Sequence, residues 1–298
     1  MHVLISGGSG FIGRALVPAL LAQGHRVSVL TRDATAAARV LPTATRLLSK
    51  LDDLHADAPQ VIVNLAGENI AGGRWTRARK AALLDSRLAM TERLVAFAAA
   101  AQPRPRALIS ASAIGWYGAT DDRALTEQDA PGADFAADLC RRWEQAAMAA
   151  EPLGLRVCRL RIGLVLGRDG GSLAKMLPAF RLGLGGVIGD GRQWMSWIHR
   201  DDLVALLLRL IADDNAVGVY NGTAPQPVTN ADFTQTLART LRRPALLPMP
   251  AALLRLLLGE LAGLLLTGQR VLPQRALAEG FTYRYASLDA ALRALLKS

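Results

Sequence analysis

The sequence has few residues of the kinds that form disulfides or bind metals. Its 298 residues include two cysteines, Cys140 and Cys158, without the spacing of a zinc site or of a disulfide framework. Such isolated thiols are typical of a reducing compartment, and we expect no metal site. The first residues lack the order of basic, apolar and small residues that marks a signal peptide. We therefore expect a cytoplasmic protein.

Long hydrophobic runs are also missing. The most apolar stretch, residues 253–266, is interrupted by Arg255, Gly259, Glu260 and Gly263 and is too short to span a bilayer. It predicts a core helix, and no membrane partner is expected.

Aromatic residues make up only 5% of the chain, which bears on the meaning of its net charge of +10. The arginines are scattered through predicted helices, and no aromatic residues interleave with a basic cluster. Nucleic acid is therefore not an expected partner.

A glycine-rich turn follows the first apolar segment. Residues 2–6 predict a short buried strand, and residues 7–13 (GGSGFIG) predict the turn that begins a helix. Gly7 permits a tight turn, Gly10 lets the backbone approach a pyrophosphate, and Gly13 lets the helix pack on the strand. The free N–H groups at the helix start favour phosphate. This pattern predicts a dinucleotide site.

Predicted strands and helices alternate through the first half of the chain. This order is typical of a parallel sheet with helices on both faces. We predict an α/β Rossmann-type, doubly wound sheet with a smaller C-terminal α+β substrate lobe. The cofactor domain would comprise residues 1–165 and 201–222, and the lobe residues 166–200 and 223–298.

The second half yields weaker predictions of individual elements. Residues 194–199 and 281–285 predict strands, and the helix that ends at Leu241 has Asn230 as its expected N-cap.

Arg32 follows the second predicted strand, where the cofactor is selected. NAD enzymes usually place a carboxylate here to hold the ribose 2′-hydroxyl, whereas an arginine accommodates the 2′-phosphate of NADP. Arg32 therefore favours NADP(H) over NAD(H). The alternative is that Arg32 is solvated and Asp33 binds the ribose.

Two further predicted strands should end beside the cofactor. Residues 60–67 end in small residues, and Glu68 and Arg74 lie in the loop beyond, where they either reach the site or are simply solvated. Residues 107–112 run into a Gly-aromatic loop that includes Tyr117. This loop is a plausible place for chemistry.

Several motifs together resemble those of the extended short-chain dehydrogenases, the group of sugar-nucleotide epimerases and dehydratases. These motifs are residues 7–13, NLAG at 64–67 and WIHRDDL at 197–203. Further stretches are similar to one branch, labelled epimerase-family proteins, NAD(P)-dependent oxidoreductases or cell-division-inhibitor-like proteins: NLAGENI at 64–70, Arg74-Trp75, SASAIGWYG at 110–118, FRLGLGG at 180–186 and GQRVLP at 268–273. The similarity covers essentially the whole chain.

The sequence departs from the wider group at its catalytic pair. The group carries Tyr-x-x-x-Lys, in which tyrosine is the acid/base and lysine lowers its pKa. Alignment on Trp143-Glu144 puts Ala136 and Cys140 at these positions. Neither residue can transfer the proton, because alanine has no acidic group and an apolar helix keeps a thiol neutral.

The candidates that remain for proton transfer are Tyr117, Ser112 or a water held by Glu68 or Asp138. The alternative is a purely structural Tyr117, packed in its glycine-rich turn.

A second departure concerns the substrate. The resemblance places Met195 where related enzymes use an arginine to bind a diphosphate, although Arg192 lies three residues earlier. A thioether cannot neutralise a diphosphate. Together with Trp194 and Trp197, Met195 would suit an apolar or aromatic molecule, or simply a core. For His199 we expect a structural hydrogen bond to Asp201 or to the backbone rather than catalysis.

The sequence therefore predicts an NADP(H)-binding oxidoreductase or epimerase-like enzyme acting on a small molecule, bound between two lobes, that is not a nucleotide sugar. The alternative is a sensor or regulatory protein that kept the cofactor site and lost catalysis. The predicted catalytic residues are Ser112 and Tyr117. The predicted cofactor-binding residues are Gly7, Gly10, Phe11, Ile12, Gly13, Thr31, Arg32, Leu65, Ala66, Gly67, Glu68, Arg74, Ser110, Ala111, Arg161 and Leu164.

Overall fold

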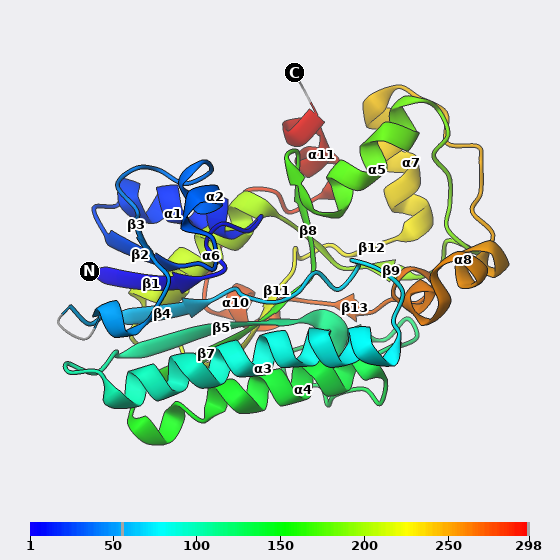
Figure 1. Cartoon of the computed structure of the whole chain (residues 1–298). Coiled ribbons are helices and arrows are strands. Elements are labelled where there is room, and N and C mark those ends of the chain that lie inside the picture. Colours follow the sequence, from blue (N-terminus) through cyan, green and yellow to red (C-terminus); the bar gives the residue numbers. More distant parts are fainter. Residues whose placement is uncertain (55–56, 297–298) are drawn as a thin grey trace.

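A seven-stranded parallel sheet forms the centre of the molecule (Figure 1). The computed structural model describes residues 1–54 and 57–296. The strand order is β11-β7-β5-β4-β1-β2-β3, which confirms the predicted Rossmann-type α/β fold. The bounds are β1 (His2–Ser6), β2 (Arg26–Leu30), β3 (Arg46–Leu48), β4 (Val61–Asn64), β5 (Ala107–Ala113), β7 (Arg156–Ile162) and β11 (Gly218–Gly222).

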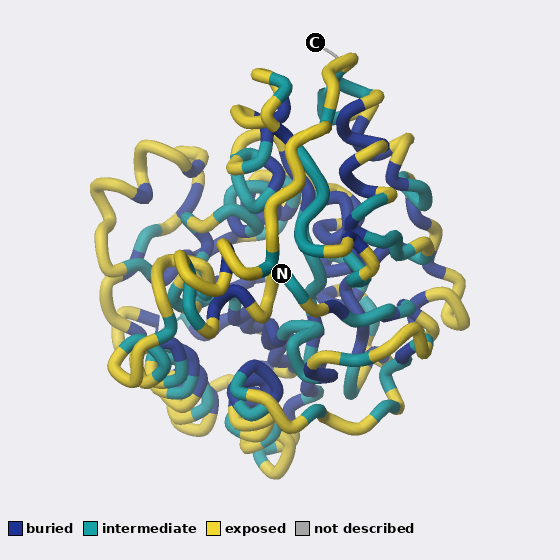
Figure 2. Tube along the Cα trace, turned by 90° about the vertical axis from the view of Figure 1, so that its right-hand side faces the viewer, coloured by how far each residue is buried: buried dark blue, intermediate teal, exposed yellow. Residues whose placement is uncertain are grey.

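Helices cover both faces of this sheet because successive residues of each strand point to opposite sides. On β1, Val3 and Ile5 pack into one core with Leu16 of α1 and Leu203 of α6, whereas Leu4 packs into another with Leu94 of α3. The helices of the first face are α1 (Gly13–Ala22), α2 (Ala34–Ala38) and α6 (Arg200–Ala212); those of the second are α3 (Arg77–Ala100) and α4 (Phe135–Met148). Figure 2 shows the buried segments gathered in the interior and the exposed ones at the periphery.

A separate apolar cluster forms the core of a second group of elements. Trp197, which has no exposed surface, packs there with Phe180 and Phe233. The group comprises β8 (Leu164–Gly167), α5 (Gly171–Arg181), β10 (Trp197–His199), α7 (Asn230–Leu241) and α11 (Leu288–Leu296). The residue limits of the two predicted domains stay a prediction.

Short elements connect these parts. Three are 3-10 helices and the others are paired two-residue strands and a one-turn helix: η1 (Asp52–Leu54), η2 (Ile114–Tyr117), η3 (Glu151–Leu153), β6 (Ala124–Leu125), β9 (Trp194–Met195), β12 (Val228–Thr229), β13 (Arg270–Val271) and α10 (Gln274–Ala278). Phe281 and Tyr283 return to the core of the large sheet. The strand predicted for residues 281–285 is wrong, because this segment packs through its aromatic rings without pairing to a neighbouring strand.

The predicted core helix over residues 253–266 is wrong in two respects. The stretch is divided into α8 (Ala251–Leu258), η4 (Gly259–Ala262) and α9 (Gly263–Leu266). Leu254 and Leu261 are buried, but Leu256 is 72% exposed.

The predicted N-cap of α7, Asn230, is also wrong: Thr229 forms a capping box with Asp232. Among the described helices, none is long and apolar enough to cross a membrane.

Candidate cofactor and reaction site

The strand order reverses between β1 and β4, because β2 and β5 lie on opposite sides of this pair. Ligands of doubly wound sheets bind outside the carboxyl ends of the strands at such a point. The register aligns these ends, since Ser6 pairs with both Leu30 and Asn64, and Asn64 pairs with Ser110. The loops after β1, β2, β4 and β5 therefore meet at one edge.

The turn after β1 is shaped so that only glycine fits at several positions. Gly7 has φ +73°, and a Cβ there would lie 2.7 Å from the Leu65 carbonyl carbon. A Cβ on Gly13 would lie 2.3 Å from the Gly8 carbonyl oxygen. At Gly10, which is exposed, the nearest atom would be the Gly7 oxygen at 3.1 Å. The tight positions close the turn, and Gly10 keeps its outer surface free of side-chain atoms.

Helix α1 begins at this turn without a side-chain cap. The backbone N–H groups of Phe11, Ile12 and Gly13 donate to no residue in the part of the chain that the structure describes. Unpartnered N–H groups and the helix dipole together attract phosphate. The turn can therefore accept a pyrophosphate, and the residues present fit a dinucleotide.

Phe11 makes a contact that the sequence did not predict. Its ring lies against the turn between β8 and α5, where a Cβ on Gly167 or Gly170 would come within 2.5–2.6 Å of ring carbons. Arg200 stacks over the same ring at 5.0 Å and forms an ion pair with Asp169. Phe11 thus joins the glycine turn to the segment that leads into α5, and its role toward the cofactor stays a prediction.

Arg32 is exposed directly after β2, and its guanidinium forms no hydrogen bond, ion pair or ring contact with the described residues. The neighbouring Asp33 caps α2 by accepting a hydrogen bond from the Ala36 N–H at 2.9 Å. The Thr31 hydroxyl donates to the backbone oxygen of Asp33. Since the cap occupies one Asp33 oxygen, Arg32 is the freer of the two groups that could meet a ribose.

A buried arginine, Arg87, contacts the loop after β4 and fixes its backbone. Arg87 donates to the backbone oxygen of Glu68 at 3.1 Å, and a Cβ on Gly67 would lie 3.1 Å from its guanidinium carbon. Glu68 itself pairs with Arg79. Leu65 and Ala66 are half-buried. The loop thus presents backbone at the predicted cofactor edge.

Arg74 turns away from this edge. It donates to the backbone oxygen of Leu256 in α8. Its contact in the structure is therefore with the C-terminal segment.

A chain of buried polar groups that the sequence did not predict lies beneath β1 and β4. The Ser6 hydroxyl donates to Asn64 at 2.6 Å, and the Asn64 amide donates to Thr91 at 2.9 Å. Trp143 also donates to Thr91. The sequence feature that could have predicted this polar chain is the polar residue at the last position of each of the two apolar strands.

The predicted catalytic hydroxyls belong to one buried network. Ser112 donates to Glu144 at 2.8 Å, and Glu144 forms a two-point ion pair with Arg161. Arg161 donates to the Tyr117 hydroxyl at 3.1 Å, and Tyr117 donates to Asn221 at 2.7 Å. All five side chains are buried. Glu144 and Asn221 were not predicted; a lone glutamate on the buried face of a helix was the available signal for the first.

Burial determines the protonation of this centre. It raises the pKa of Tyr117 to about 12, although Arg161 opposes the shift. Burial likewise raises the pKa of Cys140 to about 12, so the thiol is neutral, as expected. Ala136 and Cys140 pack under η2, where a Cβ on Gly115 would lie 3.2 Å from the Ala136 Cβ. The three other predicted positions here are buried Ser110 and Ala111 and half-buried Leu164.

His199 forms the expected hydrogen bond with Asp201. Its Nδ1 accepts a hydrogen bond from the Asp201 N–H at 3.0 Å and caps α6, while its ring stacks on Tyr285 at 3.9 Å. Burial lowers its pKa.

Of the three residues suggested for an apolar substrate, Trp197 is part of the core. Trp194 and Met195 are half-buried, and Arg270 stacks over the Trp194 ring.

A glycine-closed turn at the reversal point of a parallel sheet, followed by an uncapped helix, defines a Rossmann-type dinucleotide-binding fold. Comparison with known proteins agrees: the chain belongs to the NAD dependent epimerase/dehydratase family, whose model matches residues 3–221. Residues 249–295 match a domain of unknown function, DUF1731.

Curated relatives match over nearly their full lengths. The human epimerase family protein SDR39U1 is 38% identical, covering 99% of this chain and 100% of the relative. The chloroplastic SDR39U1 homolog of Arabidopsis thaliana is 40% identical over 100% of this chain and 87% of its own length. The crystal structure of human SDR39U1 with NADPH superposes with a TM-score of 0.90, at 36% identity and with 100% of each chain covered.

Proposed function

We propose that the protein is an NADP(H)-dependent oxidoreductase or epimerase-like enzyme whose substrate, bound between the two lobes, is a small molecule other than a nucleotide sugar. The observation that carries the cofactor proposal is Arg32, which is exposed and free of described partners while Asp33 caps α2. The relative human SDR39U1, crystallised with NADPH, supports the same choice. Met195 in place of a diphosphate-binding arginine argues against a nucleotide sugar. We further propose a cytoplasmic location.

The chain offers two kinds of group to NADP(H). Backbone N–H groups of residues 11–13 would bind the pyrophosphate, and Arg32 with Thr31 would bind the 2′-phosphate. The other residues that we propose to contact the cofactor are Gly7, Gly10, Leu65, Ala66, Gly67, Glu68, Ser110, Ala111, Arg161 and Leu164. The predicted contact of Arg74 is not proposed again, because its guanidinium donates to the Leu256 oxygen in α8. When bound, the cofactor supplies hydride chemistry at its nicotinamide C4.

Calorimetric titration with NADPH and NADH tests this proposal. We expect tighter binding of NADPH, and we expect Arg32→Ala to lower NADPH affinity about 10- to 150-fold because a charge-assisted contact contributes about 1.5–3 kcal/mol. NADH affinity should hardly change. Arg39→Ala, which removes the same charge from an exposed position at the end of α2, is the matched control. Equal affinity of the wild type for both cofactors would refute the NADP(H) preference.

For proton transfer we propose Ser112 and Tyr117, which stand at the two ends of the Glu144–Arg161 ion pair. As Ser112 takes up a proton from a substrate hydroxyl, its own proton would pass to the Glu144 carboxylate, to which it already donates. The test is oxidation or reduction of bound cofactor on exposure to a pool of metabolites. The double variant Ser112→Ala/Tyr117→Phe should abolish turnover while keeping NADPH affinity, and an unchanged rate would remove both residues from the mechanism.

A sensor that binds NADP(H) without turning it over is the second candidate. The observation that favours it is the neutral, buried state of the groups nearest the reaction centre, since burial raises the pKa of both Tyr117 and Cys140 to about 12. General acids act best when their pKa lies near the working pH. A partner protein that binds only one redox state of the complex, in a chain that shows no turnover, would support the sensor over the enzyme.

A further inference from the structure

The apolar segment that was expected in the core is largely exposed. On α8, Leu253, Leu256 and Leu257 are 45%, 72% and 57% exposed, whereas Leu254 is buried. Helices of water-soluble domains usually turn such a face inward. The described residues leave this one uncovered at the end of the molecule where α8 lies in Figure 1.

Two segments that precede α8 add to the same surface. Residues 182–188 and 245–249 run side by side, joined by the Leu184–Ala245 and Ile188–Met249 bridges and by a hydrogen bond from the Met249 N–H to the Val187 oxygen at 2.8 Å. They expose more large apolar side chains, which with those of α8 we name the leucine edge: Leu182, Leu184, Leu246, Leu247, Met249, Leu253, Leu256 and Leu257. Leu246 is 79% exposed and Leu182 74%.

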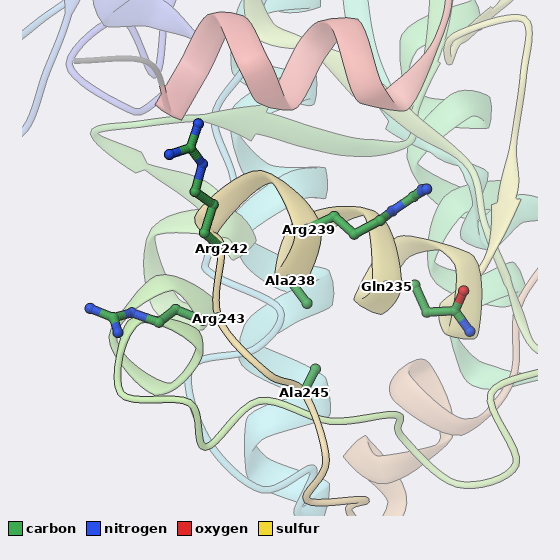
Figure 3. Close-up of a pocket in the computed structure, with 6 residues that line it drawn as sticks. All are labelled: Gln235, Ala238, Arg239, Arg242, Arg243 and Ala245. Carbon is green, nitrogen blue, oxygen red and sulfur yellow. The ribbon is translucent and has the colours of Figure 1, made fainter.

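The segments that carry the leucine edge also carry exposed basic residues. Residues 171–189 and 233–259 contain no aspartate or glutamate. Their basic residues are all exposed: Lys175, Arg181, Arg239, Arg242, Arg243 and Arg255. Arg239, Arg242 and Arg243 line a hollow of about 390 Å³ with Gln235, Ala238 and Ala245, and Figure 3 shows Arg242 and Arg243 projecting outward from the end of α7.

This combination identifies the class of partner. The surface is apolar and cationic on balance, although exposed Asp190 lines a hollow with Arg255, and Glu260, which follows α8, pairs with Lys80. Such a surface is complementary to one that is apolar and anionic, and an anionic phospholipid bilayer is such a surface. Self-association through the same patch would bring like charges together. Single-stranded nucleic acid would need exposed aromatic rings, but Phe180 and Phe233, the aromatic residues of these segments, are buried.

We propose that the leucine edge docks the protein onto anionic phospholipid membranes, with leucines entering the interface and arginines binding headgroup phosphates. This mode needs no spanning helix and departs from the expectation drawn from the sequence. It does not rest on the proposed enzymatic function. The edge does adjoin the cofactor-side loop, because Arg74 donates to the Leu256 oxygen and Lys80 pairs with Glu260.

Co-sedimentation of the full chain with vesicles tests the proposal. We expect binding to vesicles of phosphatidylcholine with phosphatidylglycerol, weak binding to phosphatidylcholine alone, and release as salt rises. Arg242→Gln/Arg243→Gln should weaken binding about 30-fold, since each basic residue near the surface contributes about fivefold. Leu246→Ser/Leu247→Ser should weaken it at least about tenfold.

Matched controls remove the same groups elsewhere: Arg39→Gln/Arg93→Gln for charge, and Leu277→Ser for an exposed leucine of α10. They should bind vesicles like the wild type, and all variants should keep wild-type thermal unfolding and NADPH affinity. Absence of binding to anionic vesicles at low salt would overturn the proposal. So would equal losses in the controls, or a dimer in solution that Leu246→Ser/Leu247→Ser dissociates.

Discussion

The glycine turn after β1 and the end of β5 lie at the same edge of one sheet. The turn offers backbone groups to a ligand, whereas the end of β5 offers side chains. The turn presents backbone N–H groups, and it requires glycines because a Cβ on Gly13, for example, would lie 2.3 Å from the Gly8 oxygen. The end of β5 presents side chains, which the Glu144–Arg161 ion pair draws into a buried network. A site made of backbone groups does not depend on particular side chains. Cofactor binding at the turn can therefore be kept when the side chains at the end of β5 change.

The largest effect is expected from removal of the Glu144–Arg161 ion pair at the end of β5. Glu144→Ala leaves the buried Arg161 guanidinium without its two-point partner, which should lower the free energy of unfolding by about 3–5 kcal/mol. Urea unfolding measures this change. Exposed Glu151, changed to alanine, should shift stability by less than about 0.5 kcal/mol. Equal changes in the free energy of unfolding of the two variants would show that the Glu144–Arg161 ion pair does not stabilise the end of β5.

A single methyl group tests the turn. In Gly13→Ala the new Cβ would lie 2.3 Å from a backbone oxygen, which should cost about 1–3 kcal/mol of stability and displace the N–H groups that face the cofactor. Gly263→Ala is the matched control, because its Cβ meets open space and its φ of −53° is helical. The control should gain about 0.4–1 kcal/mol. NADPH titration of Gly13→Ala with unchanged affinity would disprove the role of the turn.

The smallest expected effect concerns the Tyr117 hydroxyl. Tyr117→Phe loses a hydrogen bond to Asn221, which should cost about 1 kcal/mol at pH 7. Burial raises the pKa of Tyr117 from 10.0 to about 12. Between these values the unfolded chain releases the proton first, so this group makes stability fall as pH rises. Urea unfolding from pH 8 to 11 should show a shallower fall in the variant, and parallel curves would contradict the buried state of the hydroxyl.

The sequence predicted the large sheet well because its strands are short apolar runs with glycine, proline or polar residues between them. The glycine turn and the parallel order followed from that pattern. Contacts between distant segments could not be predicted from this local pattern. Ser112, Glu144 and Tyr117 share one network because the sheet register and the position of α4 bring them together.

The C-terminal predictions failed for physical reasons. The apolar composition of residues 253–266 predicted burial, but this short stretch has too few neighbours to cover all of its leucines. At α7, both Thr229 and Asn230 can cap a helix; Thr229 has Asp232 three residues later, which completes a capping box. Asn230 instead accepts a hydrogen bond from the Ile188 N–H.

In the proposed complex the backbone N–H groups of residues 11–13 hold NADP(H), and Arg32 selects NADP(H) over NAD(H). Amide hydrogen exchange with and without saturating NADPH measures this at the residues concerned. We expect slower exchange at Phe11, Ile12 and Gly13, whose N–H groups have no described partner in the free chain, and little change at the already buried Ser112. Unaltered exchange at residues 11–13 under saturating NADPH would contradict the claim.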